Sequence, residues 1–461
     1  MGTKNYLNYL IAGTLMLSTF GACTKKINTL EKQPLTSTMA DDTARVGMHV
    51  AAVSNFTYTV KPNEWMVDGT NIPAGGVVYI PAGRRGALLL KNFKGTLTAP
   101  IIVVNQGGKV TFSTDVTASY GFKTQNCRYF KVLGNGDPAV KYGFEVEGGN
   151  IGMTMDDLST DFEIGYFDVH NSGFAGIMAK TDPTCDPATW RGHFTMRNVN
   201  IHDNYIHQTG GEGIYIGNSF YEDGVSSSCG TVLPHDVVNL RVLRNVTDST
   251  GSEGIQVGSA TSGCIIYGNN VNHPGISPFS AYQDNGIQIG EGTGGKCYNN
   301  VVKNAPGNGI IVLGLGDNLV YNNYILNSKS YGIFADSRYT PGPNFQFINN
   351  TVVGSLLGGI KLNSETIPMN TVINNAFIQP AGVQAIIKKS SDVKLTALNN
   401  YVGTNVNDCK FLNYNGGNFR LQASSPFIDK GTDVAVYGVQ IDYYGKDRDN
   451  GEGVDVGATE Y

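Results

Sequence analysis

The chain has 461 residues and a formal net charge of −5, and only 15% of its residues are charged. No basic cluster recurs along one face, which argues against nucleic acid as a partner. The 59 glycines, together with many Val, Ile, Thr, Tyr and Phe residues, favour short strands and tight corners over helices.

The first 22 residues have the pattern of an export signal. Lys4 supplies a positive charge, residues 9–20 form an apolar core, and Gly21-Ala22-Cys23 ends a small-residue cleavage site. The pattern resembles a bacterial lipoprotein signal, which implies that Cys23 is lipidated and anchors the chain to the cell envelope, at the periplasmic or surface leaflet of the outer membrane. A plain secretory signal is the alternative. Residues 23–64 are then a tether, and 65–424 are the folded domain.

Asn-Asn pairs recur through the second half of the chain at the period of one coil of a stacked repeat. The second members of the pairs are 30, 23, 27, 25 and 25 residues apart. Asparagine suits a repeated corner because it tolerates a left-handed backbone and bonds neighbouring main chain. Self-similarity at this period predicts stacked units that bury their apolar faces against each other. The second members are Asn270, Asn300, Asn323, Asn350, Asn375 and Asn400.

A Gly-Ile strand follows each corner. Because side chains alternate along a strand, the residue after the first Ile of each strand is expected to point outward. This outward column is polar in the middle coils and apolar downstream. It consists of Met178, Tyr215, Gln256, Gln288, Ile311, Phe334 and Lys361.

The last segment, residues 425–461, is expected to cap the solenoid. Its role would be to cover the open strand edges of the last coil, which otherwise template aggregation. Asp429, Asp442 and Arg448 are interpreted as hydrogen-bonding groups of this cap rather than as catalytic residues.

These features resemble those of exported right-handed parallel β-helix proteins of the pectate-lyase-like superfamily. The residues that carry the resemblance are the glycine- and proline-punctuated run 72–105, the Asn-x-apolar repeats and the closing segment. The resemblance implies an all-β chain, a single-stranded right-handed parallel β-helix of about 12 coils with a C-terminal cap. It also implies a monomer that acts on polysaccharide, because that superfamily contains polysaccharide lyases and glycoside hydrolases.

Acid and imidazole groups concentrate at the turns that precede the Gly-Ile strands between residues 168 and 292. A solenoid needs no charge at these turns, as the downstream coils show. The first positions of the turns form one predicted column, and the last positions form another. The first positions are His170, His207, Asp248, His273, Asn304 and Asn327. The last positions are Ala175, Glu212, Glu253, Asn285, Asn308 and Tyr331, with Asp284 beside Asn285.

Long insertions occur in the same coils, at residues 180–193, 217–236 and 274–284. Long loops in a compact repeat are usually functional, and their aromatic residues are suited to stacking on sugar rings. We therefore expect them to wall a groove on the outward column. Cys185 and Cys229 lie in insertions of consecutive coils, so we expect a disulfide between them. The predicted substrate-binding residues are His170, Tyr215, Gln256, Gln288, Lys180, Trp190, Arg191, Tyr221 and Tyr282.

Glu212 and Glu253 occupy equivalent places on adjacent coils, about 5 Å apart in a regular stack. This spacing suits a retaining glycosidase, and the pair Glu212–Asp284, two coils apart, suits an inverting one. For β-elimination, His207 or His273 would be the base. No cofactor is required by the hydrolytic reading, whereas the lyase reading adds Ca²⁺ held by Asp248, Glu212 and Glu253.

The leading hypothesis is therefore cleavage of glycosidic bonds, with hydrolysis ahead of elimination because acids are paired and basic groups are few. The alternative is a non-catalytic glycan-binding or surface structural protein, in which the glutamates only accept hydrogen bonds at the turns. The hypothesis depends on one geometric prediction, that His207, Glu212, Glu253, His273 and Asp284 meet on a shared wall of a triangular tube, coil above coil.

Overall fold

A computed structural model describes residues 55–338, 342–449 and 451–461. The predicted signal, the lipidation site Cys23 and most of the tether lie outside the described residues. No helix within the described ranges is long and apolar enough to cross a membrane. The paired strands of the solenoid run from Thr57 to Gly403, so they begin before and end before the predicted limits of 65 and 424.

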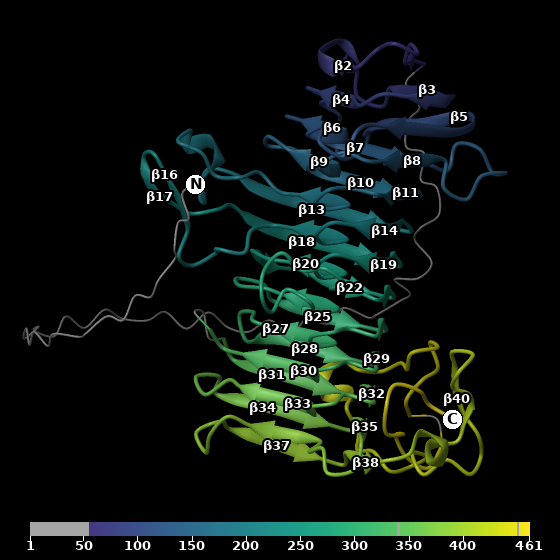
Figure 1. Cartoon of the computed structure of the whole chain (residues 1–461), viewed down its shortest axis with the longest axis vertical. Helices are drawn as coiled ribbons and strands as arrows, with labels where there is room; N and C mark the ends of the chain where they lie inside the picture. The colour runs from purple at the N-terminus through teal and green to yellow at the C-terminus, as the bar shows by residue number, and fades with distance from the viewer. Residues whose placement is uncertain (1–54, 339–341, 450) are drawn as a thin grey trace, which may run out of the picture. The chain divides into compact units, whose positions relative to one another are not determined.

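The chain winds as a parallel β-helix in which each coil pairs with the next (Figure 1). One face is a sheet of 12 parallel strands, one per coil, here called the twelve-strand face. Its strands are β2 (Met66–Asp68), β4 (Leu88–Lys91), β6 (Tyr120–Gln125), β9 (Ile151–Asp156), β12 (Ile177–Ala179), β15 (Ile214–Ile216), β20 (Ile255–Val257), β24 (Ile287–Ile289), β27 (Ile310–Val312), β30 (Tyr331–Asp336), β33 (Gly358–Asn363) and β36 (Ile386–Lys388).

The other sheet has 24 strands and bends at a corner, so that it supplies two faces. The strands before the corner form the leading face, and those after it form the trailing face. The leading strands are β1 (Thr57–Thr59), β3 (Val77–Arg85), β5 (Ile101–Ser113, which continues into the trailing face), β7 (Arg128–Leu133), β10 (Thr160–Gly165), β13 (Thr195–His202), β18 (Asp236–Leu243), β21 (Ala260–Ser262), β22 (Ile265–Tyr267), β25 (Gly295–Tyr298), β28 (Asp317–Tyr321), β31 (Asn344–Ile348), β34 (Met369–Ile373) and β37 (Leu395–Leu398). The trailing strands are β8 (Phe144–Glu147), β11 (Phe167–His170), β14 (Tyr205–Thr209), β19 (Val246–Thr250), β23 (Asn270–Asn272), β26 (Val301–Lys303), β29 (Tyr324–Leu326), β32 (Thr351–Val353), β35 (Ala376–Ile378) and β38 (Tyr401–Gly403).

Short elements outside the coils complete the fold. Two antiparallel hairpins, β16 (Val225–Ser227) with β17 (Gly230–Val232) and β39 (Phe411–Asn413) with β40 (Asn418–Leu421), belong to an insertion and to the terminal segment. The short helices are η1 (Gly69–Asn71), η2 (Pro187–Thr189), η3 (Val406–Cys409) and η4 (Ala435–Tyr437).

A ladder of asparagine side chains forms the corner between the leading and trailing faces. Each amide nitrogen donates to the side-chain oxygen of the next coil, at 2.9 to 3.1 Å. The residue before each ladder member is left-handed, with φ between 49° and 67°, a conformation that asparagine and glycine tolerate best. The ladder residues are Asn204, Asn245, Asn269, Asn300, Asn323, Asn350, Asn375 and Asn400.

One predicted member of this corner is wrong by one position. Asn269, not Asn270, joins the ladder, and Asn270 is exposed at the start of β23. The reason is that Gly268, with φ 67°, fills the left-handed position that the first asparagine of the pair fills in later coils.

The outward column of the twelve-strand face has the predicted register. Met178 is paired with Tyr215, Tyr215 with Gln256, and Gln256 with Gln288. The register continues through Ile311 and Phe334 to Lys361. The flanking isoleucines and valines of these strands point into the tube and are fully or almost fully buried.

The terminal segment packs along the side of the solenoid and not across its last coil (Figure 1). Phe411, Phe419 and Phe427 bury outward side chains of the trailing strands β26 to β35, and Val434 and Val439 bury those of β28 to β34. Among the described residues, β36, β37 and β38 pair only with the preceding coil, and the inward-register residue Val402 is 61% exposed. The terminal segment is therefore folded against the solenoid, but the prediction that it covers the strand edges of the last coil is wrong.

Candidate active site

Glu212 and Glu253 stack on adjacent coils at the turn that leads into the twelve-strand face. The Gly213 amide donates to the Glu253 carbonyl at 2.9 Å, and the Gly176 amide donates to the Glu212 carbonyl at 2.9 Å. The equivalent residue one coil earlier, Ala175, packs with the outward side chains of Met178 and Tyr215. The turn column therefore borders the outer side of the twelve-strand face and not the interior of the tube.

Both carboxyl groups are withdrawn from water and incompletely bonded. Glu212 is 1% exposed and Glu253 is 0% exposed, and the Oε2 atom of each has no hydrogen-bond partner among the described residues. Burial raises the pKa of Glu212 to about 7. Burial, with a smaller contribution from the Glu212 charge, raises the pKa of Glu253 to about 8, although Asn285 Nδ2 donates to Glu253 Oε1 at 3.0 Å and opposes the rise.

Asp284 adds a third acid to this cluster. It is half-buried, burial raises its pKa, and its charge acts on Glu253. The Lys180 ammonium lies 4.7 Å from the centre of the Tyr215 ring, and its charge acts on Glu212. The structure thus brings Glu212, Glu253 and Asp284 together, as the sequence predicted.

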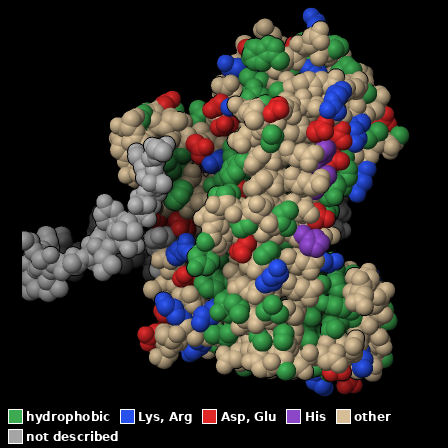
Figure 2. All heavy atoms as spheres, viewed as in Figure 1, with side chains coloured by type: hydrophobic (Ala, Val, Ile, Leu, Met, Phe, Trp, Pro, Cys, Tyr) green, Lys and Arg blue, Asp and Glu red, His purple; other side chains and the backbone are tan. Residues whose placement is uncertain are grey.

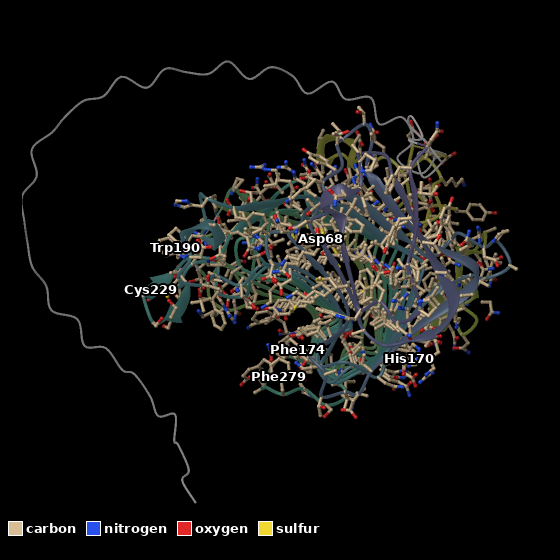
Figure 3. All side chains as sticks on the ribbon, turned by 90° about the horizontal axis from the view of Figure 1, so that it is seen from above. Asp68, His170, Phe174, Trp190, Cys229 and Phe279 are labelled. Atoms are coloured by element: carbon tan, nitrogen blue, oxygen red, sulfur yellow. A yellow bond between two sulfur atoms is a disulfide. The ribbon has the colours of Figure 1, made fainter. Side chains whose placement is uncertain are left out.

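The insertion 274–284 folds back over the turns that carry the two glutamates. Its amides at Gly275, Ile276 and Ser277 donate to carbonyls of residues 250–252, at 2.8 to 3.0 Å. The ring of Phe279 lies 5.6 Å from the ring of Phe174 (Figure 3). Because Phe174 precedes the first of the two turns and the insertion follows the second, this contact spans both turns. The predicted open groove is therefore closed above Glu212 and Glu253.

Polar groups of the outward column continue the site along the sheet. The Tyr215 and Ser219 hydroxyls lie 3.0 Å apart, and Gln256 Nε2 donates to Ser219 Oγ at 2.7 Å. Gln256 is 1% exposed, and its Oε1 has no partner among the described residues, whereas Gln288 is half-buried. Ser219 was not anticipated, since it lies at the base of an insertion and no pattern singles it out.

The insertions 180–193 and 217–236 form a separate arm that projects from the solenoid (Figures 1 and 3). Cys185 and Cys229 form the expected disulfide, with their Cα atoms 5.7 Å apart. Trp190 Nε1 donates to the Thr184 carbonyl at 2.6 Å, and the Arg191 guanidinium lies 3.6 Å from the centre of the Tyr221 ring.

This arrangement corrects part of the predicted substrate-binding set. Trp190, Arg191 and Tyr221 stabilise the arm itself, and Figure 3 shows Trp190 well away from Phe174 and Phe279. Tyr282, by contrast, belongs to the covering insertion, is 87% exposed, and accepts a hydrogen bond from Asn285 at its carbonyl. Lys180, Tyr215, Gln256 and Gln288 lie on the twelve-strand face as predicted.

The histidines do not join the acids. His170 ends the trailing strand β11, and His207 lies in the middle of β14. Their rings stack at 4.9 Å, and His207 Nε2 lies 3.1 Å from Asp168 Oδ1. Figure 2 shows histidines in a strip with acidic side chains over this face, and Figure 3 places His170 away from Phe174. The chain turns a corner between His207 and Glu212, so the predicted shared wall is wrong for His207.

His273 and Asp248, one of the predicted calcium ligands, are also separated from the acid pair. In the strand register Asp248 is aligned with Asn272, so His273 is one position later, left-handed and 53% exposed, with Nδ1 3.4 Å from Asp248 Oδ1. Asp248 belongs to the trailing face and does not join Glu212 and Glu253. In the described part of the chain, no group of three His, Cys, Asp or Glu residues is placed to hold a metal ion.

Comparison with known proteins supports the fold. The family described as right handed beta helix region matches residues 235–405, which include Glu253 but not Glu212. No curated protein matches the chain. The parallel β-helix is thus right-handed, in agreement with the sequence.

Solved structures with the same architecture differ widely in sequence. A GH136 lacto-N-biosidase from Eubacterium ramulus is similar over 72% of this chain and 62% of its own, with 14% identity and a TM-score of 0.50. The pectate lyase Pel9A is similar over 89% of this chain and 98% of its own, with 14% identity and a TM-score of 0.48. The chain spans less than two thirds of the length of the lacto-N-biosidase. At this identity the similarity is one of fold.

Proposed function

We propose that the protein hydrolyses glycosidic bonds in a polysaccharide, with Glu212 and Glu253 as its two catalytic carboxyl groups. The observation that carries the proposal is the stacked, water-excluded pair, in which each glutamate has one unbonded oxygen. Adjacent strands are about 4.8 Å apart, close to the separation of about 5 to 5.5 Å between the carboxyl groups of retaining glycosidases. A structural turn acceptor has no need for an unsatisfied buried oxygen, which costs folding free energy.

The surroundings of the two groups assign the roles. The charge of Lys180 favours the ionised form of Glu212, whereas the charges of Glu212 and Asp284 favour the protonated form of Glu253. The Glu212 carboxylate attacks the anomeric carbon while the bond to the leaving oxygen breaks, and that oxygen takes the proton of Glu253. Water then gives a proton to Glu253 and displaces Glu212, which returns both groups to their first state. Substrate entry requires the insertion 274–284 to move.

The proposal is tested with Glu212→Gln and Glu253→Gln on a panel of plant, algal and host polysaccharides. Each change is expected to lower reducing-end release by about a hundredfold or more while binding persists. Glu365→Gln, which removes an acid ion-paired to Lys389 on the downstream coils, is the matched control and should keep full activity.

The same assay separates the alternatives. Elimination creates an unsaturated uronic product that absorbs light at about 235 nm, whereas the products of hydrolysis do not absorb there. Glycan binding without turnover in the unchanged protein would favour the non-catalytic reading. One feature favours the non-catalytic alternative. Asn285 donates to Glu253 Oε1 and Asn308 donates to Asn285 Oδ1, so Glu253 begins a ladder of side-chain hydrogen bonds along the turns.

We also propose that the protein is exported and anchored through a lipid on Cys23. The Cys185–Cys229 disulfide supports export, because such bonds persist in oxidising compartments. Cys23→Ser should abolish incorporation of labelled fatty acid and release the protein from the membrane fraction. An unchanged membrane fraction in that variant would contradict the anchor.

A further inference from the structure

The charges around the acid pair bear on the class of glycan that the site accepts. Uronate polymers carry a carboxylate on each sugar, and a protein that binds them needs cations free to meet those carboxylates. Along the twelve-strand face from β6 to β24, and in the insertions that follow its strands, the described basic residues are Lys123, Lys180 and Arg191.

Each of these three cations already has an acidic partner. Lys123 Nζ lies 2.9 Å from Asp157 Oδ2 and 3.3 Å from Asp156 Oδ2. Lys180 Nζ lies 2.8 Å from Asp182 Oδ1. Both lysines are therefore already engaged in ion pairs within the protein.

Arg191 is held in the arm away from the acid pair. Its Nε donates to the Pro234 carbonyl at 3.2 Å and lies 3.9 Å from Asp236 Oδ1, and its guanidinium stacks on the Tyr221 ring. These contacts occupy the fork that a carboxylate would need.

The acids near the reacting position have no such neutralisation. Glu212, Glu253 and Asp284 are neighbours, and Lys180 is the one cation among the described residues whose charge acts on Glu212. A substrate carboxylate entering beside the Glu212 carboxylate would meet like charge in a site that excludes water, where repulsion is strongest. Uncharged hydroxyls meet no such penalty.

The neighbouring polar groups suit hydroxyls. Gln256 is 1% exposed, and its Oε1 is an acceptor without a donor among the described residues. Gln288, one coil further on, is half-buried. An amide oxygen accepts a hydrogen bond from a sugar hydroxyl, whereas an ionised carboxylate has no hydrogen to donate to it. The exposed rings of Phe279 and Tyr282 add surfaces for sugar rings.

We infer that the site takes an uncharged glycan, whose hydroxyls are bonded by Gln256 and Gln288, and rejects uronate polymers. This inference rests on the proposed hydrolysis at Glu212 and Glu253. It excludes elimination as the reaction, because elimination needs a uronate.

The test compares neutral polymers (galactan, xylan, mannan and β-glucan) with polygalacturonate and alginate, using the full chain. At least one neutral polymer should be cleaved about tenfold faster or more than either uronate polymer. The uronate polymers, added at equal mass, should not inhibit that cleavage. Gln288→Lys should make them inhibitory about tenfold more strongly, and salt should relieve the inhibition. Gln288→Leu is the uncharged control and should not acquire this inhibition.

Two results separate the inference from the proposed function. Preferred cleavage of a uronate polymer that is lost in Glu212→Gln overturns the inference and keeps the catalytic pair. Cleavage of a neutral polymer that is unchanged in Glu212→Gln overturns the proposed function. Failure to cleave or bind any polymer overturns both.

Discussion

One asparagine side chain forms the hydrogen bonds at the corner of each downstream coil. The pair Asn269 and Asn270 shows that position decides how much each asparagine contributes to stability. Asn269 donates to Asn300 Oδ1 and to the Val242 carbonyl, both at 2.9 Å, and its Oδ1 accepts from the Asn245 main chain and side chain. Asn270 is exposed beside it. Removal of the ladder amide leaves buried donors without acceptors, whereas removal of the exposed amide does not.

Asn269→Ala is therefore expected to lower the free energy of unfolding by about 3 kcal/mol, and Asn270→Ala by about 0.5 kcal/mol or less. Chemical denaturation of the two variants measures the difference. Equal losses would show that the ladder does not stabilise the corner.

A second residue-scale feature is the charge network around His202, on the outer side of the leading face. Lys131 pairs with Glu163 at 2.7 Å, Glu163 with His202 at 3.0 Å, His202 with Asp203 at 2.7 Å, and Asp203 with Arg244 at 2.6 Å. Burial alone would lower the pKa of His202, but its bonds to Asp203 and Glu163 raise it above the usual 6.5. The pKa of Glu163 and that of Asp203 fall to about 2, because their bonds to cations outweigh burial.

The stability of the protein should follow these shifts. The contribution of His202 is complete below about pH 6.5 and is lost as pH rises through its raised pKa. The contribution of the two acids is complete above about pH 4.5 and is lost as pH falls toward 2. Melting temperatures recorded from pH 3 to 9 should thus peak near pH 5 to 6. In His202→Gln the loss above about pH 6.5 should disappear, whereas His273→Gln, at an exposed histidine, should keep the parent profile.

At the scale of elements, the insertion 274–284 is the part of the fold that packs beside the acid pair. Its attachment includes three main-chain bonds to residues 250–252, the Phe279–Phe174 contact, and bonds near its end from Asn285 Nδ2 to the Tyr282 carbonyl and from the Gly307 amide to the Asp284 carbonyl. Phe279 is 58% exposed, so its ring contributes a contact at the rim and not a core position. An element held by so few contacts opens at lower free energy than the coils beneath it.

Phe279→Ala should raise hydrogen exchange of residues 274–284 by about fivefold to tenfold and leave the melting temperature of the solenoid almost unchanged. Phe220→Ala, at an equally exposed ring in the arm, is the control. Exchange that is unchanged by Phe279→Ala, or raised to the same extent by Phe220→Ala, would show that the Phe279–Phe174 contact does not hold the insertion in place.

For the whole molecule, the sequence predicted what depends on period and missed what depends on the path of individual turns. Equal positions in the repeat were enough to place Glu212 beside Glu253 and to order the outward column from Met178 to Lys361. The repeat spacing did not reveal the corner between His207 and Glu212, at which Gln208 adopts a left-handed conformation with φ 53°. The side-wall position of the terminal segment also escaped prediction, since it follows from apolar outward residues such as Tyr324 and Ile378 that resemble core positions in the sequence.

That side-wall packing leads to a prediction about how the molecule unfolds. In a solenoid each coil contacts only its neighbours, so a defect is felt locally unless another segment ties the coils together. The terminal segment does so for the coils between Val301 and Ile378, where Phe427 is 1% exposed in the shared cluster. Phe427→Ala leaves a cavity worth about 3 to 5 kcal/mol. It should raise hydrogen exchange throughout residues 301–378 and 411–461, and leave residues 77–170 protected. Phe112→Ala, in the core of the upstream coils, should produce the opposite pattern. Uniform exchange across both regions in either variant would show that the chain unfolds as one cooperative unit instead.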